Sequence, residues 1–120
     1  MVDKKGTSIK REELISTAMA IILHAGDARA KIDKALSEVK SLNLDVAKND
    51  IEEAKKELHK AHVCQMNIIS NEASGQFYEA SLLFNHAQDT LMTTMSEERI
   101  ISQMIDVFEI MFKKIEGGLE

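Results

Sequence analysis

The chain contains no proline and only five glycines among its 120 residues. Proline and glycine are the strongest terminators of helices, and tight turns depend on them. A chain with so few of them has little means of making the many turns of a strand-rich fold, so we expect mostly long helices. The length is that of about one domain, and residues 1–120 are expected to form a single helical domain.

Composition also limits where the protein works and what it binds. The apolar runs, such as Ala18–Leu23, are far shorter than the roughly 18 residues needed to span a bilayer. The N-terminus lacks an apolar signal core, and the single cysteine, Cys64, cannot form an internal disulfide. We therefore expect a cytoplasmic protein that is not membrane-embedded. The 15 basic and 20 acidic residues are interspersed, without the basic stripe that nucleic acid requires, so a nucleic-acid partner is not expected.

Apolar residues recur at spacings of three and four over three segments. This period predicts helices at about 9–41, 45–72 and 77–116, and hence an all-α fold. Arg29 is the one polar interruption in the apolar stripe of the first segment.

Two sequence signals bear on the ends of these helices. Thr7 or Ser8 is expected to cap the first helix, since a hydroxyl can accept from the free backbone N–H groups of a first turn. Thr94 followed by Glu97 resembles a capping box, so the third helix is either continuous or interrupted near 94–97.

The third segment is unusually apolar between residues 100 and 112, where nine of thirteen residues are hydrophobic. A helix packed on one side does not require so many. Two helices of the same chain cover only part of such a surface, which favours contact with a symmetry mate. The alternative is a well-buried helix of a monomeric bundle, and periodicity alone does not choose between the two.

A polar island, residues 85–90, interrupts this apolar helix. Within it His86 and Asp89 stand three residues apart and so share one face. A histidine here is a candidate nucleophile, general base or metal ligand, because its imidazole is largely neutral near pH 7. A lone helical histidine is usually just solvated, but the neighbouring Asn85 and Gln88 favour a functional site.

The other histidines and Cys64 are weaker candidates for a metal ligand or a nucleophile. His59 and His62 are three residues apart, yet no further ligand recurs at a spacing that completes a metal site, and His24 is expected to pack or to face solvent. Cys64 has no basic neighbour that would activate its thiol, so it is expected to be a small helix residue and not a nucleophile. The sequence has no glycine-rich phosphate loop, which excludes an ATP-dependent kinase.

Four blocks of the sequence resemble a known family. They are residues 19–29, 61–65, 71–75 and, above all, the segment His86–Met92. In order and spacing they are similar to the enzyme IIA component of the lactose/cellobiose (chitobiose) class of the bacterial phosphoenolpyruvate-dependent sugar phosphotransferase system. The resemblance extends over roughly residues 14–112.

The resemblance implies a homotrimer of antiparallel three-helix subunits, a nine-helix bundle. It implies that His86 accepts a phosphoryl group, on its outer nitrogen Nε2, from the histidine-containing phosphocarrier protein. The group then passes to a cysteine of the cognate IIB component during uptake of a lactose/cellobiose-type β-glycoside. Thr90 departs from the family pattern, because a second histidine often stands at that position.

The resemblance further implies that Asp89 lies at the trimer axis, where three copies hold one divalent ion, typically Mg²⁺. Three carboxylates on a dry axis repel one another, so a metal ion or protonation must relieve them. Asn85 and Gln88 are possible donors to the phosphoryl oxygens, and Gln88 more easily reaches a neighbouring subunit than its own histidine.

Apolar residues flank His86 and have two open interpretations. They form either a docking surface for the donor and acceptor proteins or part of the trimer core. These residues are Leu82, Leu83, Leu91 and Met92.

Two other functions remain as alternatives. A histidine phosphotransfer domain of two-component signalling is also helical with an exposed histidine. A basic residue beside that histidine would help to hold phosphate there, and none lies between Tyr78 and Glu98. A purely structural helical oligomer would leave the polar island unexplained.

Overall fold

The computed structural model describes residues 4–118, with side chains from residue 10 onward. It consists of three helices, α1 (Lys4–Lys40), α2 (Leu44–Ala73) and α3 (Leu82–Gly118). Residues 4–118 contain no strand, so the all-α expectation is confirmed. The molecule is elongated, with extents of 76 × 22 × 18 Å.

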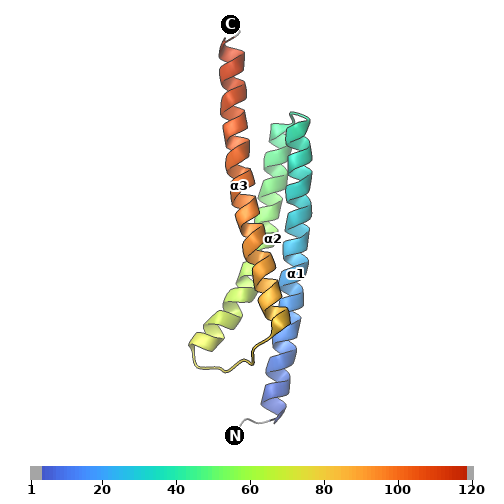
Figure 1. Cartoon of the computed structure of the whole chain (residues 1–120), viewed down its shortest axis with the longest axis vertical. Helices are drawn as coiled ribbons and strands as arrows, with labels where there is room; N and C mark the ends of the chain where they lie inside the picture. The colour runs from blue at the N-terminus through green and yellow to red at the C-terminus, as the bar shows by residue number, and fades with distance from the viewer. Residues whose placement is uncertain (1–3, 119–120) are drawn as a thin grey trace.

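The helices run up, down and up (Figure 1). α1 and α2 form an antiparallel hairpin, and α3 lies along it and continues past its closed end (Figure 1). Between Leu14 and Ala35 every third or fourth residue of α1 is buried, and four of these seven residues, like three of the eight buried residues of α2, are alanines. Small side chains let the two backbones approach closely, so the hairpin packs tightly without aromatic residues. The buried residues of α1 are Leu14, Ala18, Ile21, Ala25, Ala28, Ile32 and Ala35.

The turn between α1 and α2 is closed by backbone hydrogen bonds. The N–H of Asn43 donates to the carbonyl of Glu38 at 2.8 Å, and that of Leu42 to Val39 at 2.9 Å. Leu42 has a φ of 65°, in the left-handed region that usually holds glycine at a helix end. α2 begins and ends within one residue of the predicted 45–72.

The third helix begins at Leu82, five residues later than the predicted 77. Its first turn is capped by Ser81, whose Oγ accepts from the N–H of Phe84 at 3.1 Å. The preceding segment is held extended by Tyr78, which is buried and whose hydroxyl accepts from Asn71 Nδ2 at 3.0 Å. The apolar period could not indicate this start, because Phe77 and Tyr78 belong to the connection.

The predicted cap of the first helix is wrong, whereas the third helix is continuous, one of the two outcomes expected for it. α1 already begins at Lys4, so Thr7 and Ser8 lie inside the helix, and their side chains lie outside the described part of the chain. α3 continues without a break through 94–97. The hydroxyl of Thr94 donates back to the carbonyl of Thr90 at 2.7 Å, as fits a position inside a helix.

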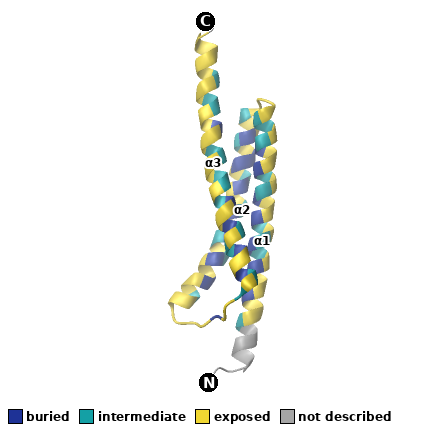
Figure 2. Ribbon diagram, in the orientation of Figure 1, coloured by how far each residue is buried: buried dark blue, intermediate teal, exposed yellow. Residues whose placement is uncertain are grey.

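α3 is the least covered helix, and most of its C-terminal half is exposed (Figure 2). Beyond Thr94 only Ile105 is buried, so α3 is not the well-buried helix of a monomeric bundle. Its exposed apolar residues are Ile100, Met104, Val107, Ile110, Met111 and Ile115. Within residues 4–118, none of the helices is both long and apolar enough to cross a membrane.

Candidate functional site

The polar island lies on an exposed stripe that runs the length of α3. The stripe alternates steps of three and four residues, and every member is exposed in the subunit. We call it the α3 heptad stripe; it consists of His86, Asp89, Thr93, Ser96, Ile100, Gln103, Val107 and Ile110. A period of 3.5 residues is typical of a coiled-coil seam, in which each such position faces a partner helix.

His86 is exposed in the second turn of α3. The hydroxyl of Thr90 donates to the His86 carbonyl at 2.9 Å and so braces the backbone below the ring. Among the described side chains none hydrogen-bonds the imidazole, so the subunit leaves both ring nitrogens available. An exposed neutral imidazole of this kind can act as a nucleophile.

Gln88 points toward α2 and not toward His86. Its Oε1 accepts from Nε2 of Gln65 at 3.1 Å, and Gln65 is only 6% exposed. Sequence reasoning missed the role of Gln65, although a polar residue in the apolar period of α2 was a signal for it. Asn85 is exposed and lines, with Gln88, a small hollow between the start of α3 and the end of α2.

Asp89 lies one turn after His86 on the stripe and is exposed. Within residues 10–118 no hydrogen bond or ion pair engages its carboxylate, so both oxygens are available to a ligand. Oxygen donors of this kind suit Mg²⁺.

The four apolar residues that flank His86 have different environments. Leu91 is fully buried in the subunit core, so it takes no part in a docking surface. Leu83 packs partly against that core. Leu82 and Met92 are 87% and 51% exposed and remain available to a partner.

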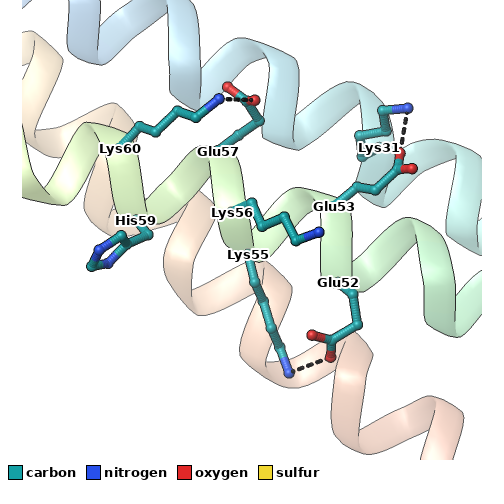
Figure 3. A pocket seen from close by; sticks show the side chains of 8 residues that line it. All are labelled: Lys31, Glu52, Glu53, Lys55, Lys56, Glu57, His59 and Lys60. Atoms are coloured by element: carbon teal, nitrogen blue, oxygen red, sulfur yellow. Dashed lines mark hydrogen bonds and ion pairs between the residues drawn. The ribbon is translucent and has the colours of Figure 1, made fainter.

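A second hollow lies on the charged outer face of α2 (Figure 3). Three of its four lysines are already paired: Lys31 with Glu53 at 2.6 Å, Lys55 with Glu52 at 3.2 Å and Lys60 with Glu57 at 3.0 Å. The hydrogen bond from Lys31 lowers the pKa of Glu53 and raises that of Lys31 itself, so both groups stay charged. With three lysines paired and three glutamates in its lining, this hollow does not favour an anion, whereas the α3 heptad stripe presents His86 and Asp89 without partners among the described side chains.

Comparison with known proteins identifies the family of the chain. The family model described as "PTS system, Lactose/Cellobiose specific IIA subunit" matches residues 16–109 and thus includes His86. The chain belongs to this family. It is therefore a IIA component of the phosphotransferase system, not a histidine phosphotransfer domain of two-component signalling.

The curated relatives of this IIA subunit are named for different sugars. The lichenan-specific phosphotransferase enzyme IIA component of Bacillus subtilis is 37% identical over 82% of this chain and 89% of its own. The N,N'-diacetylchitobiose-specific EIIA component of Escherichia coli K12 is 32% identical over 86% of this chain and 89% of its own.

Solved structures share the fold of this IIA subunit. The crystal structure of PtcA from S. mutans has a TM-score of 0.80 and 35% identity, over 82% of this chain and 96% of that one. The solution structures of a IIA(Chitobiose)–HPr complex give a TM-score of 0.71 and 29% identity, over 82% and 95% of the two chains.

Proposed function

We propose that this IIA subunit is a cytoplasmic phosphocarrier in which His86 accepts a phosphoryl group from the histidine-containing phosphocarrier protein, HPr. One observation carries the proposal: His86 is exposed, its imidazole has no partner among the described side chains, and it lies inside the family match. The related chitobiose IIA whose structure was solved in complex with HPr supports HPr as the donor.

The chemistry is an exchange of one phosphorus bond for another. Nε2 of His86 forms a bond to phosphorus as the bond to the donor's imidazole breaks, and the electron pair returns to the donor nitrogen. In the second transfer a cysteine thiolate of the IIB component forms the P–S bond, and His86 leaves as neutral imidazole. Such transfers depend mainly on positioning and charge stabilisation, which an exposed imidazole on a rigid helix allows.

The α3 heptad stripe supports a homotrimer. Ile100 and Ile110 occupy its two alternating positions, and isoleucine at both kinds of position favours coiled coils of three or four strands over dimers. Association through the apolar part of this stripe, residues 100–110, would bury the apolar residues that the subunit leaves exposed, and would leave His86, at the N-terminal end of the stripe, accessible to HPr. It would also bring three copies of Asp89 to one axis beside His86.

Asp89 is the residue that would hold a metal ion in this trimer. Its free carboxylate offers the hard oxygen ligands that Mg²⁺ prefers. When bound, the ion would offset the repulsion of three like charges. Asn85, exposed one residue before His86, is a proposed donor to the phosphoryl oxygens. Gln88, which Gln65 orients away from its own His86, would donate its amide N–H to the phosphoryl group of a neighbouring subunit.

Reconstitution tests the proposal. The protein is incubated with labelled phosphoenolpyruvate, enzyme I and HPr, and transferred label is measured. We expect wild type and His59→Ala to be labelled and His86→Ala to remain unlabelled. His59 is the matched control because it is an exposed histidine on another helix. Label that persists in His86→Ala defeats the assignment.

A further inference from the structure

Three metal-ligating side chains converge between α1 and α2, outside the α3 heptad stripe. His24 and Asp27 lie one turn apart on α1, and Glu57 faces them from α2. His24 Nδ1 is 2.9 Å from Glu57 Oε2, and one donor atom from each of the three residues lies within 4.8 Å of the others. The proposed phosphocarrier chemistry uses none of them.

These distances are close to those of a metal site. Zn²⁺ binds imidazole nitrogen and carboxylate oxygen at about 2.0–2.2 Å, so the ligands of a tetrahedral ion lie roughly 3.4 Å apart. Donor atoms within 4.8 Å of one another are already near that separation, and rotation of the side chains is the movement that an ion would require. An imidazole among the ligands suits Zn²⁺ and not Mg²⁺, which prefers oxygen ligands only.

The surroundings orient the ligands and leave them accessible. Lys60 holds Oε1 of Glu57 at 3.0 Å (Figure 3), which turns Oε2 toward His24. The side chains of His24 and Glu57 are 28% and 23% exposed. An ion can therefore enter from solvent, while the two helices fix the backbone of every ligand.

We propose that His24, Asp27 and Glu57 bind one Zn²⁺ per subunit, with water in the fourth position. One neutral imidazole and two carboxylates balance the charge of the ion. The bound ion joins the middle of α1 to the middle of α2, and it stabilises the folded hairpin because it binds the unfolded chain far more weakly. This site is separate from the oxygen-only site proposed at Asp89, and it does not depend on phosphoryl transfer.

Calorimetric titration of the full chain with ZnCl₂, after removal of metal by EDTA, tests the proposal. We expect one Zn²⁺ per subunit and a rise in Tm on binding. His24→Gln and Asp27→Asn should each weaken binding by at least about tenfold. Asp27 is exposed, so its variant keeps the fold even if His24→Gln does not.

Three control variants distinguish this site from other places where the chain could bind Zn²⁺. His62→Gln and Cys64→Ser remove two other strong zinc ligands of α2, and Asp89→Leu removes the carboxylate proposed at the trimer axis. All three should keep the affinity and the stoichiometry of one ion per subunit. Unchanged binding in both His24→Gln and Asp27→Asn, loss of binding in a control, or a wild-type Kd weaker than about 1 mM overturns the proposal.

Discussion

Glu97 and Glu98 are adjacent on α3, but the carboxylate of Glu97 is hydrogen-bonded and one oxygen of Glu98 is not. Glu97 accepts from Arg29 Nε and Nη2, both at 3.1 Å, in a two-pronged ion pair that joins α3 to α1. The side chain of Glu98 is only 13% exposed, and its Oε1 is buried without a hydrogen bond among the described residues. The nearest cation, Lys55, lies 3.8 Å away.

Replacing each glutamate with glutamine should therefore change stability in opposite directions at pH 7. Glu98→Gln should stabilise the fold by up to about 1 kcal/mol, since it removes a buried charge without a hydrogen bond. Glu97→Gln should destabilise it by about 0.5–1 kcal/mol, since the pair with Arg29 is half exposed. Urea unfolding at one fixed protein concentration measures both effects. A loss of stability in Glu98→Gln would contradict the account.

The gain in Glu98→Gln should depend on pH. Burial raises the pKa of Glu98 above its ordinary value of 4.5; Lys55 opposes this shift, and Glu52 adds to it. The folded state therefore holds the proton more tightly, so the contribution of Glu98 is most favourable below pH 4.5 and is lost as pH rises through the raised pKa. The difference between wild type and Glu98→Gln should thus be large at pH 7 and vanish near pH 4.

At the scale of one element, the α1–α2 turn holds a leucine where the backbone favours glycine. Leu42 has a φ of 65° and is 68% exposed, so its side chain contributes little packing to offset the strain. Leu42→Gly should stabilise the protein by up to about 1 kcal/mol, as the released strain exceeds the cost of added backbone freedom. Thermal unfolding measures the change. Leu42→Ala is the matched control and should give no comparable gain, because alanine is strained there too.

The sequence predicted the helices better than their ends. The 3.6-residue period defined α2 to within one residue, because apolar positions fill its whole length. It placed the start of α3 too early, since the aromatic residues before Ser81 fit a helical period while Tyr78 in fact anchors a connection. The polar Arg29 in an apolar stripe could be noticed from the sequence. Its partner Glu97, 68 positions away, could not.

The candidate site was predictable only as far as local sequence patterns reach. The polar island singled out His86 and Asp89, and spacing alone placed them on one face of a helix. The hydrogen bond between Gln65 and Gln88 joins two helices, and no local pattern encodes such a contact. The burial of Leu91 likewise depends on the way α3 crosses the hairpin, which periodicity does not determine.

At the scale of the whole molecule, the single subunit leaves much of the apolar surface of α3 exposed. α3 extends beyond the hairpin that supports it (Figure 1), and most of its C-terminal half is exposed (Figure 2), including the apolar residues Ile100, Val107 and Ile110 of the α3 heptad stripe. The proposed trimer would cover these residues with two further copies of α3. One hundred and twenty residues would then form a third of the working core.

A charge placed in the stripe should break this assembly. Val107 is 52% exposed in the subunit, so Val107→Asp should leave the subunit folded but place three carboxylates in the trimer core. Light scattering coupled to size exclusion should give a trimer for wild type and a monomer for Val107→Asp. Val46→Asp is the control, since Val46 is a similarly exposed valine on α2. A trimer in Val107→Asp would exclude the stripe as the interface.

Removing the charge at Asp89 should have the opposite effect and favour the proposed trimer. Asp89→Leu replaces mutual repulsion at the proposed axis with apolar packing, so this variant should stay trimeric in EDTA. The wild-type trimer should weaken in EDTA and recover when Mg²⁺ is added. Sedimentation at matched concentrations compares the two proteins, and a monomeric Asp89→Leu variant would refute this account of the axis.

The central claim is that His86 carries a phosphoryl group only transiently. Tandem mass spectrometry at neutral pH, which preserves the acid-labile P–N bond, locates the group after incubation with HPr and follows it when the IIB component is added. The account predicts phosphate on His86 alone and its loss once IIB is present. Phosphate on another residue, or phosphate that stays on His86 in the presence of IIB, would contradict it.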